Sequence, residues 1–73
     1  MAQALTEAQL LDQAENAERV ARTAEGRCDW AWAADHWEAA AERLAMVGQE
    51  VEAVHCRRFA REDRERARAA RGN

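Results

Sequence analysis

The sequence is 73 residues long, contains no proline and carries a formal net charge of −3. A chain of this length forms one domain at most and buries only about 60% of the surface that its unfolded form exposes, so we expect marginal stability. Two cysteines cannot make a disulfide framework, and no apolar run approaches the roughly 20 residues of a membrane-spanning helix. Residues 1–7 contain no basic residue, so we expect no secretory signal and a cytoplasmic protein.

Strong helix formers dominate the chain, and no stretch shows the alternating pattern of a strand, which predicts an all-α fold. The basic residues are all arginine and alanine is very frequent, a bias that is typical of bacterial, phage or plasmid genes of high GC content. Charge is uneven: residues 1–56 carry a net charge of −7 and residues 57–73 a net charge of +4. Such asymmetry can mark a segment that contacts a partner.

The first predicted helix covers residues 6–24. Thr6 and Gln9 have the spacing of a capping box, and Gly26 supplies the expected stop. Its packing face consists almost entirely of alanine, at spacings of three and four residues: Leu10, Ala14, Ala17, Ala21 and Ala24. Side chains this small let a neighbouring helix approach closely.

The second predicted helix covers residues 29–46, with Asp29 as its N-cap and Gly48 as its stop. Its core stripe alternates large and small side chains, namely Trp30, Ala33, Trp37, Ala40 and Leu44, flanked by Ala34 and Ala41. We expect the two tryptophans of this stripe to fill the space that the alanines of the first helix leave open.

The third predicted helix covers residues 50–70. We expect its apolar side to hold Val51, Cys56, Phe59 and Ala60. Asp63 falls in the middle of that side, so we expect the last turns to project into solvent and to fray. The loops at 25–28 and 47–49 are short, which makes consecutive helices antiparallel neighbours. The chain is therefore predicted to be one domain, 1–73, of three antiparallel helices.

The middle of the chain, about residues 14–60, resembles a tetratricopeptide repeat, a helix pair with small and large residues at fixed offsets. In one frame the matching residues are Ala21, Asp29, Trp30, Ala33, Trp37 and Ala40. In a second frame they are Trp37, Ala41, Gly48, Ala53 and Ala60. The resemblance implies a helical hairpin followed by a capping C-terminal helix, in a protein that binds other proteins.

Cys28, His36, His55 and Cys56 are the side-chain types of a zinc site. Their spacing argues against zinc, because structural sites pair ligands two to five residues apart and adjacent helical residues point about 100° apart. No cysteine has an orienting partner for nucleophilic catalysis. We therefore expect no metal, no cofactor and no enzymatic activity.

The carboxylates Asp35, Glu38 and Glu42 share one strip of the second helix. Acid/base catalysis would need a concave, partly desolvated pocket, which a unit this small hardly offers. A solvated face is the favoured interpretation. The alternative is a contact strip that meets a basic partner or mimics nucleic-acid phosphates.

Trp32 lies about 200° from Trp30 around the helix, on a face that it shares with His36, Ala39, Arg43 and Met46. Tryptophan, arginine and methionine are enriched at protein interfaces. Two interpretations stay open: this face is a protein-binding surface formed by Trp32, His36, Arg43 and Met46, or it is a second core seam against a neighbouring helix.

On the third helix, arginines recur at spacings of four and three and form a basic ridge: Arg57, Arg61, Arg64, Arg68 and Arg71. Such a ridge could follow nucleic-acid phosphates. We favour a solvated helix with intrahelical ion pairs, Arg58 with Glu62, Arg61 with Glu65 and Glu62 with Arg66, because no aromatic residue interleaves the ridge. We expect no direct nucleic-acid binding and no membrane binding.

The sequence thus predicts a small protein-interaction module that binds a protein partner and is stabilised by that partner or by self-association. Two alternatives remain open. One is an inhibitor from a phage or plasmid, similar in size and acidity to anti-CRISPR proteins, that blocks a nucleic-acid-binding complex. The other is a DNA-binding regulator that uses the arginine ridge.

Overall fold

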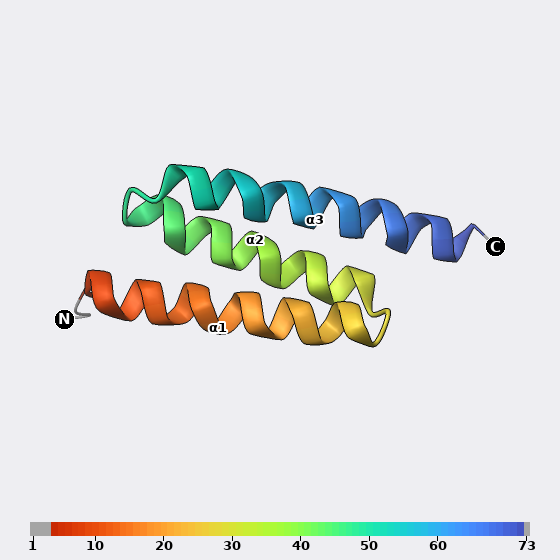
Figure 1. The fold of residues 1–73 in the computed structure, drawn as a ribbon, viewed down its shortest axis with the longest axis horizontal. Coiled ribbons are helices and arrows are strands. Elements are labelled where there is room, and N and C mark those ends of the chain that lie inside the picture. Colours follow the sequence, from red (N-terminus) through yellow and green to blue (C-terminus); the bar gives the residue numbers. More distant parts are fainter. Residues whose placement is uncertain (1–3, 73) are drawn as a thin grey trace.

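The computed structural model describes residues 4–72 and contains three α-helices: α1 (Glu7–Gly26), α2 (Trp30–Met46) and α3 (Glu50–Arg71). Consecutive helices run antiparallel, and α2 lies between α1 and α3 (Figure 1). The all-α fold of three antiparallel helices that the sequence predicts is therefore confirmed, with helix boundaries within two residues of the expected ones.

The three helices form an open arrangement in which α2 packs along both neighbours while the backbones of α1 and α3 hardly approach each other. The molecule is elongated, with extents of 48, 22 and 21 Å. The C-terminal turns of α3 extend past the α1–α2 turn (Figure 1). One side of α2 therefore faces both neighbours, and its opposite side is left uncovered.

The core is built mainly from alanine. All five residues predicted for the packing face of the first helix are buried on α1, and the predicted stripe of the second helix is buried on α2 except for Trp30, which is half-buried. Small side chains on both helices allow the close approach that the sequence predicts.

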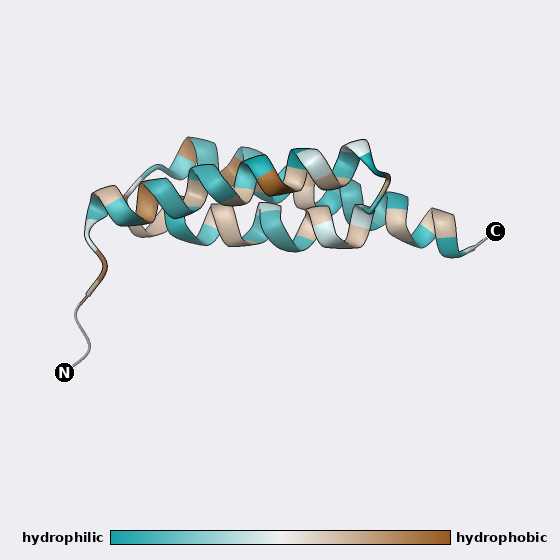
Figure 2. Cartoon of the chain, turned by 90° about the horizontal axis from the view of Figure 1, so that it is seen from below, coloured by the Kyte–Doolittle hydropathy of each residue, from teal (hydrophilic) through white to brown (hydrophobic). Residues whose placement is uncertain are grey.

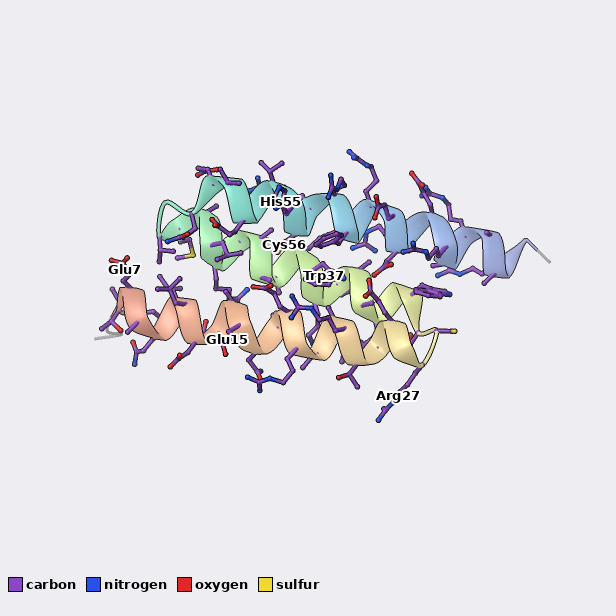
Figure 3. The ribbon with its side chains drawn as sticks, in the orientation of Figure 1. Glu7, Glu15, Arg27, Trp37, His55 and Cys56 are labelled. Atoms are coloured by element: carbon purple, nitrogen blue, oxygen red, sulfur yellow. The ribbon has the colours of Figure 1, made fainter. Side chains whose placement is uncertain are left out.

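Trp37 provides most of the bulk in this core. Its side chain is 3% exposed and points between the helices (Figure 3). The ring of Phe59 from α3 packs against it with 4.9 Å between ring centroids. From α1, the guanidinium of Arg22 lies 5.4 Å from the Trp37 ring centroid. One side chain of α2 therefore joins all three helices.

The two interhelical turns have the same geometry, but a different residue takes the left-handed conformation in each. In the second turn Gly48 adopts the left-handed conformation (φ 79°), and Gln49 N–H donates to the Leu44 carbonyl oxygen at 2.8 Å. In the first turn the equivalent left-handed residue is Cys28 (φ 58°), and Asp29 N–H donates to the Ala24 carbonyl oxygen at 2.9 Å. Both are Schellman turns, which favour glycine at this position.

The prediction that Gly26 stops the first helix is therefore wrong in detail. Gly26 is the last helical residue of α1, and the chain turns two residues later, at Cys28. The sequence rule identifies a nearby glycine, but the hydrogen-bonding frame of the turn decides which residue takes the left-handed conformation.

The helix starts also differ from one another. The capping box of α1 is confirmed: Thr6 Oγ1 accepts from Gln9 N–H at 3.1 Å, and Gln9 Oε1 accepts from Thr6 N–H at 2.8 Å. Asp29 occupies the N-cap position of α2, but its side chain makes no capping hydrogen bond. The prediction that Asp29 caps the second helix is thus confirmed in position and wrong in mechanism.

The buried side of α3 differs from the predicted one in two places. Val51 is 66% exposed, whereas Ala53 is fully buried and takes its place against α2. Asp63 does not end the buried stripe, because its side chain is 0% exposed. The last turn is exposed, as expected, and the helix continues to Arg71.

Within residues 4–72, no helix is long and apolar enough to cross a membrane. Hydrophilic residues interrupt the apolar ones along every helix (Figure 2).

Candidate protein-interaction surfaces

The uncovered side of α2 carries the face that the sequence singles out, here called the outer face of α2: Trp32, His36, Ala39, Arg43 and Met46. Trp32 is 53% exposed, and its ring stacks on that of His36 with 4.6 Å between centroids. His36 Nδ1 lies 3.1 Å from the carbonyl oxygen of Trp32, one helical turn earlier. The two aromatic side chains support one another on the surface.

Arg43 is half-buried, as are His36 and Ala39, and its contacts explain how a charged residue fits there. Its Nε donates to Gln13 Oε1 of α1 at 3.3 Å, and its Nη1 donates to the carbonyl oxygen of Ala39 at 3.3 Å. Met46 is 69% exposed. The structure thus exposes Trp32 and Met46, whereas His36, Ala39 and Arg43 are half-buried and Ala39 packs against the core.

A hollow lies beside Trp32, where the end of α1 meets the start of α2. Its lining comes from both helices and the turn between them: Asn16, Arg19, Val20, Thr23, Ala24, Arg27, Asp29 and Trp32. Arg27 points away from the core at this end of the molecule (Figure 3). The indole therefore stands at the rim of a shallow, arginine-bearing depression.

A second surface is the groove between α2 and α3, of about 410 Å³. The structure brings together there the acidic strip and the basic ridge, which the sequence treats as separate. Its lining is Glu38, Ala41 and Glu42 from α2 with Arg57, Ala60, Arg61, Arg64 and Arg68 from α3. Acids form one wall, arginines form the other, and two alanines form the floor.

Arg64 connects the two walls. Its Nη2 lies 3.1 Å from Asp35 Oδ1, and its Nε donates to Glu38 Oε1 at 2.8 Å. The hydrogen bonds to Glu38 and Asp35 raise the pKa of the Arg64 guanidinium further above its already high ordinary value. Two carboxylates of the acidic strip are therefore engaged in holding α3 against α2.

The intrahelical ion pairs expected along the third helix are not among the ion pairs of residues 4–72. Arg66 bonds Asp63 at 2.7 Å instead of Glu62, and Arg64 crosses to α2. The carboxylate of Asp63 is buried and therefore attracts Arg66 more strongly than the less buried Glu62 does, because water screens a desolvated pair less.

A buried cluster that the sequence does not reveal lies where α1 and α3 meet over Trp37. Glu25 Oε2 accepts from Trp37 Nε1 at 3.0 Å, and Asp63 Oδ1 accepts from Arg66 Nη1 at 2.7 Å. Glu25 is half-buried and its carboxyl group lies near that of the fully buried Asp63, whose Oδ2 has no hydrogen-bond partner. The only sequence signal for the burial of Asp63 is its spacing from the buried residues of the third helix, which places it on the same face.

The electrostatics of this cluster follow from its burial. Desolvation, followed by hydrogen bonding to Asp63, raises the pKa of Glu25, while the N–H of Trp37 acts in the opposite direction. Repulsion from the nearby carboxylate of Asp63 adds to the raised pKa of Glu25.

The cysteines and histidines do not come together. Cys28 is exposed on the first turn, Cys56 is buried, and His55 points away from the core (Figure 3). Within residues 4–72 no three acids, cysteines or histidines form a group that could hold a metal ion. Burial raises the pKa of the Cys56 thiol to about 11, which keeps it protonated at neutral pH.

Comparison of the chain with families of known proteins, with curated proteins and with solved structures finds no match.

Proposed function

We propose that this chain is a non-enzymatic protein-interaction module and that its contact surface is the outer face of α2. The observation that supports this most directly is the position of Trp32, a large aromatic side chain that is 53% exposed on a helix whose other side forms the core. Exposed tryptophan next to arginine and methionine is the composition of interface hot spots.

The reactive side chains support a binding role over a catalytic one. The Cys56 thiol is buried with a pKa of about 11, and Asp35 and Glu38 are bonded to Arg64. The buried Glu25–Asp63 pair bonds Trp37 and Arg66, which gives it a role in holding the helices together.

The helix order also suits a repeat-like module. At the α1–α2 seam the small residues Ala21, Ala33 and Ala40 are fully buried, as the small positions of a tetratricopeptide helix pair require. In that comparison α3 takes the role of a capping helix, because it covers the second flank of α2.

The two other functions remain hypotheses with weaker support. Mimicry of nucleic-acid phosphates by the acidic strip would need free carboxylates, and Arg64 engages two of the three. DNA binding by the ridge would need a continuous row of arginines, and Arg64 is withdrawn from that row. Arg57, Arg61 and Arg68 remain exposed along the groove and are the residues to replace if DNA binding is found.

Site-specific photo-crosslinking tests the proposal. A benzophenone amino acid is placed at position 32, and separately at Glu15, an exposed residue of α1 that serves as the matched control. Both variants are produced in the cell that encodes the protein, irradiated and analysed by mass spectrometry. We expect a discrete adduct from position 32 that is absent from position 15. No adduct at position 32, or the same adducts from both positions, would contradict the proposal.

A further inference from the structure

The groove between α2 and α3 extends beyond its hollow of about 410 Å³. A second hollow of about 290 Å³ adjoins it toward the C-terminal end of α3, and Arg64 and Arg68 line both hollows. Ala31 of α2 and Ala67 of α3 line the second hollow, as two alanines line the first. The groove therefore has small apolar side chains along its length and arginines along its α3 wall.

The arginines of this wall follow a regular spacing. Five of them, from Arg57 to Arg71, recur at intervals of four, three, four and three residues and span about 21 Å of helix. All five line one hollow or both. Residues at these intervals are neighbours on a helix surface, and like charges there disfavour the helix. An anionic ligand along the wall would remove this repulsion.

One arginine of the wall is already paired, and the other four are not. Arg64 forms ion pairs with Asp35 and Glu38. The other acid of the groove, Glu42, lies 3.7 Å from Arg43 of its own helix. The remaining arginines of the wall, here called the open arginines, are exposed and form no ion pair within residues 4–72: Arg57, Arg61, Arg68 and Arg71.

The groove is positive on a chain that is negative as a whole. Four arginines and two acids line the larger hollow, which gives it a net charge of +2, and Arg71 adds one positive charge in the second hollow. The whole chain carries −3. Because each acid of the groove already has a cation beside it, the open arginines set the potential there. The groove is thus complementary to an anionic ligand.

We propose that this groove binds an acidic, amphipathic helix of a protein partner. Carboxylates at intervals of four and three residues on such a helix lie opposite the open arginines, whose intervals are the same. Its small apolar side chains meet the alanines of the groove, which let a further helix approach closely. The groove shares no residue with the outer face of α2, so this contact goes beyond the proposed function and stands or fails separately.

A nucleic-acid strand fits the groove less well. Its phosphates carry charge along the whole strand and would lie beside the carboxylates of Glu38 and Glu42 as well as beside the arginines. Its bases need aromatic side chains to stack on, and none of the described residues that line the two hollows is aromatic. A helix can direct carboxylates to one wall and apolar side chains to the alanines, so the lining of the groove favours a peptide.

Fluorescence anisotropy with a defined probe tests the proposal. The probe is a fluorescein-labelled peptide of about 15 residues, made of alanine and serine with glutamates at intervals of four, three, four and three. We expect saturable binding with a dissociation constant on the order of 10–100 μM at low salt, as for a small interface, and weaker binding as the salt concentration rises. The same peptide with glutamine in place of glutamate is the control ligand and should bind at least about tenfold more weakly.

Matched variants of the protein locate the binding. Arg61→Glu combined with Arg68→Glu reverses two open arginines and should weaken binding at least about tenfold. Arg27→Glu combined with Arg58→Glu makes the same change of charge at exposed arginines outside the groove, and its binding should stay within about threefold of the wild type.

Circular dichroism checks that each variant is folded. Arg61→Gln combined with Arg68→Gln introduces no new charge and should weaken binding by an intermediate factor, so it provides the test if the glutamate variant does not fold.

Three results would overturn the proposal. One is the absence of saturable binding of the glutamate peptide to the wild type. Another is an equal loss in the two glutamate double variants, which would show attraction to net charge alone. The third is tighter binding of a labelled DNA duplex or single strand than of the peptide, which would make the open arginines a nucleic-acid surface. A discrete adduct from position 32 together with any of these results would keep the proposed function and overturn only the groove.

Discussion

The two sides of α2 each carry a tryptophan, but their surroundings differ completely. On the inner side Trp37 is 3% exposed, with α1 and α3 contributing partners to its ring and its N–H. On the outer side Trp32 is 53% exposed, its ring lies against His36 at a tilt of 51°, and it borders the shallow hollow at the end of α1. The same residue type therefore serves the fold on one side and is available for a partner on the other, and the neighbouring helices decide which.

The largest effect should come from Trp37→Ala. Removing a buried aromatic ring of this size costs roughly 3–5 kcal/mol, which is comparable to the whole stability of a domain this small. We expect loss of the helical circular-dichroism signal at 25 °C, or a thermal unfolding midpoint far below that of the wild type. A variant that melts within a few degrees of the wild type would show that Trp37 does not anchor the core.

An alanine exchange sharpens the comparison without removing an aromatic ring. Ala40 is fully buried on the inner side, and Ala39 lies next to it in the sequence on the outer side. Ala40→Leu overfills the seam with α1 and should destabilise the protein by about 1–3 kcal/mol. Ala39→Leu, its matched control, lies half-buried at the edge of the core and should destabilise the protein less than Ala40→Leu does. Equal effects in urea unfolding would contradict the assignment of the two sides.

The third prediction concerns the carboxyl groups of Glu25 and Asp63, which lie beside Trp37 on the inner side of α2. Because the pKa of Glu25 is raised in the folded state, folding takes up a proton there. The stability that the pair contributes is full below the ordinary pKa of a glutamate and is lost as the pH rises through the raised value.

Glu25→Gln should remove that pH dependence. The glutamine amide can donate to the unpartnered Asp63 Oδ2 and accept from Trp37 Nε1. We therefore expect the free energy of unfolding to exceed that of the wild type by about 1 kcal/mol at pH 8, and the difference to shrink toward pH 5. Urea unfolding across this pH range measures it. Glu62→Gln is the control, because Glu62 and Glu25 both line a hollow beside Trp30 and Arg66, and Glu62 does not join the pair. A Glu25→Gln variant that is less stable than the wild type at pH 8 would show that a charged Glu25 does not weaken the fold.

The smallest effect on stability should come from Trp32→Ala. In dilute solution we expect the free energy of unfolding to fall by about 1 kcal/mol or less, because about half of the side chain is already exposed to water. The contact with a partner should weaken by about 2 kcal/mol or more if Trp32 is a hot spot. Unfolding as severe as that of Trp37→Ala would instead place Trp32 in a second core seam.

The sequence predicts the helices and the α1–α2 seam closely, because alanine periodicity has few alternative interpretations. It fails where a residue's role depends on the third helix. Asp63 interrupts the apolar stripe of the sequence, but Glu25, Arg66 and the ring of Trp37 make a site for it. The sequence pattern assigns Val51 to that stripe, but Val51 lies about 200° around the helix from Ala53, the first-turn residue that is fully buried.

The surfaces could be predicted only in part. The outer face of α2 is visible in the sequence as residues on one side of a helix, and the structure places its large members at the surface. The groove could not be predicted, since the acidic strip and the basic ridge are each regular on their own helix. Only the antiparallel packing of α3 brings Arg64 to Asp35 and Glu38.

The open order of the helices has a consequence for how the chain folds. Each helix packs mainly on its neighbour in the sequence, so most contacts are local and folding should be fast. In such a linear array either hairpin could form first and a terminal helix could detach by itself. The bonds that Trp37 and Glu25 make link α1, α2 and α3 at one point, and we expect this point to make unfolding cooperative. Without it, hydrogen exchange would reveal α1 and α3 opening independently.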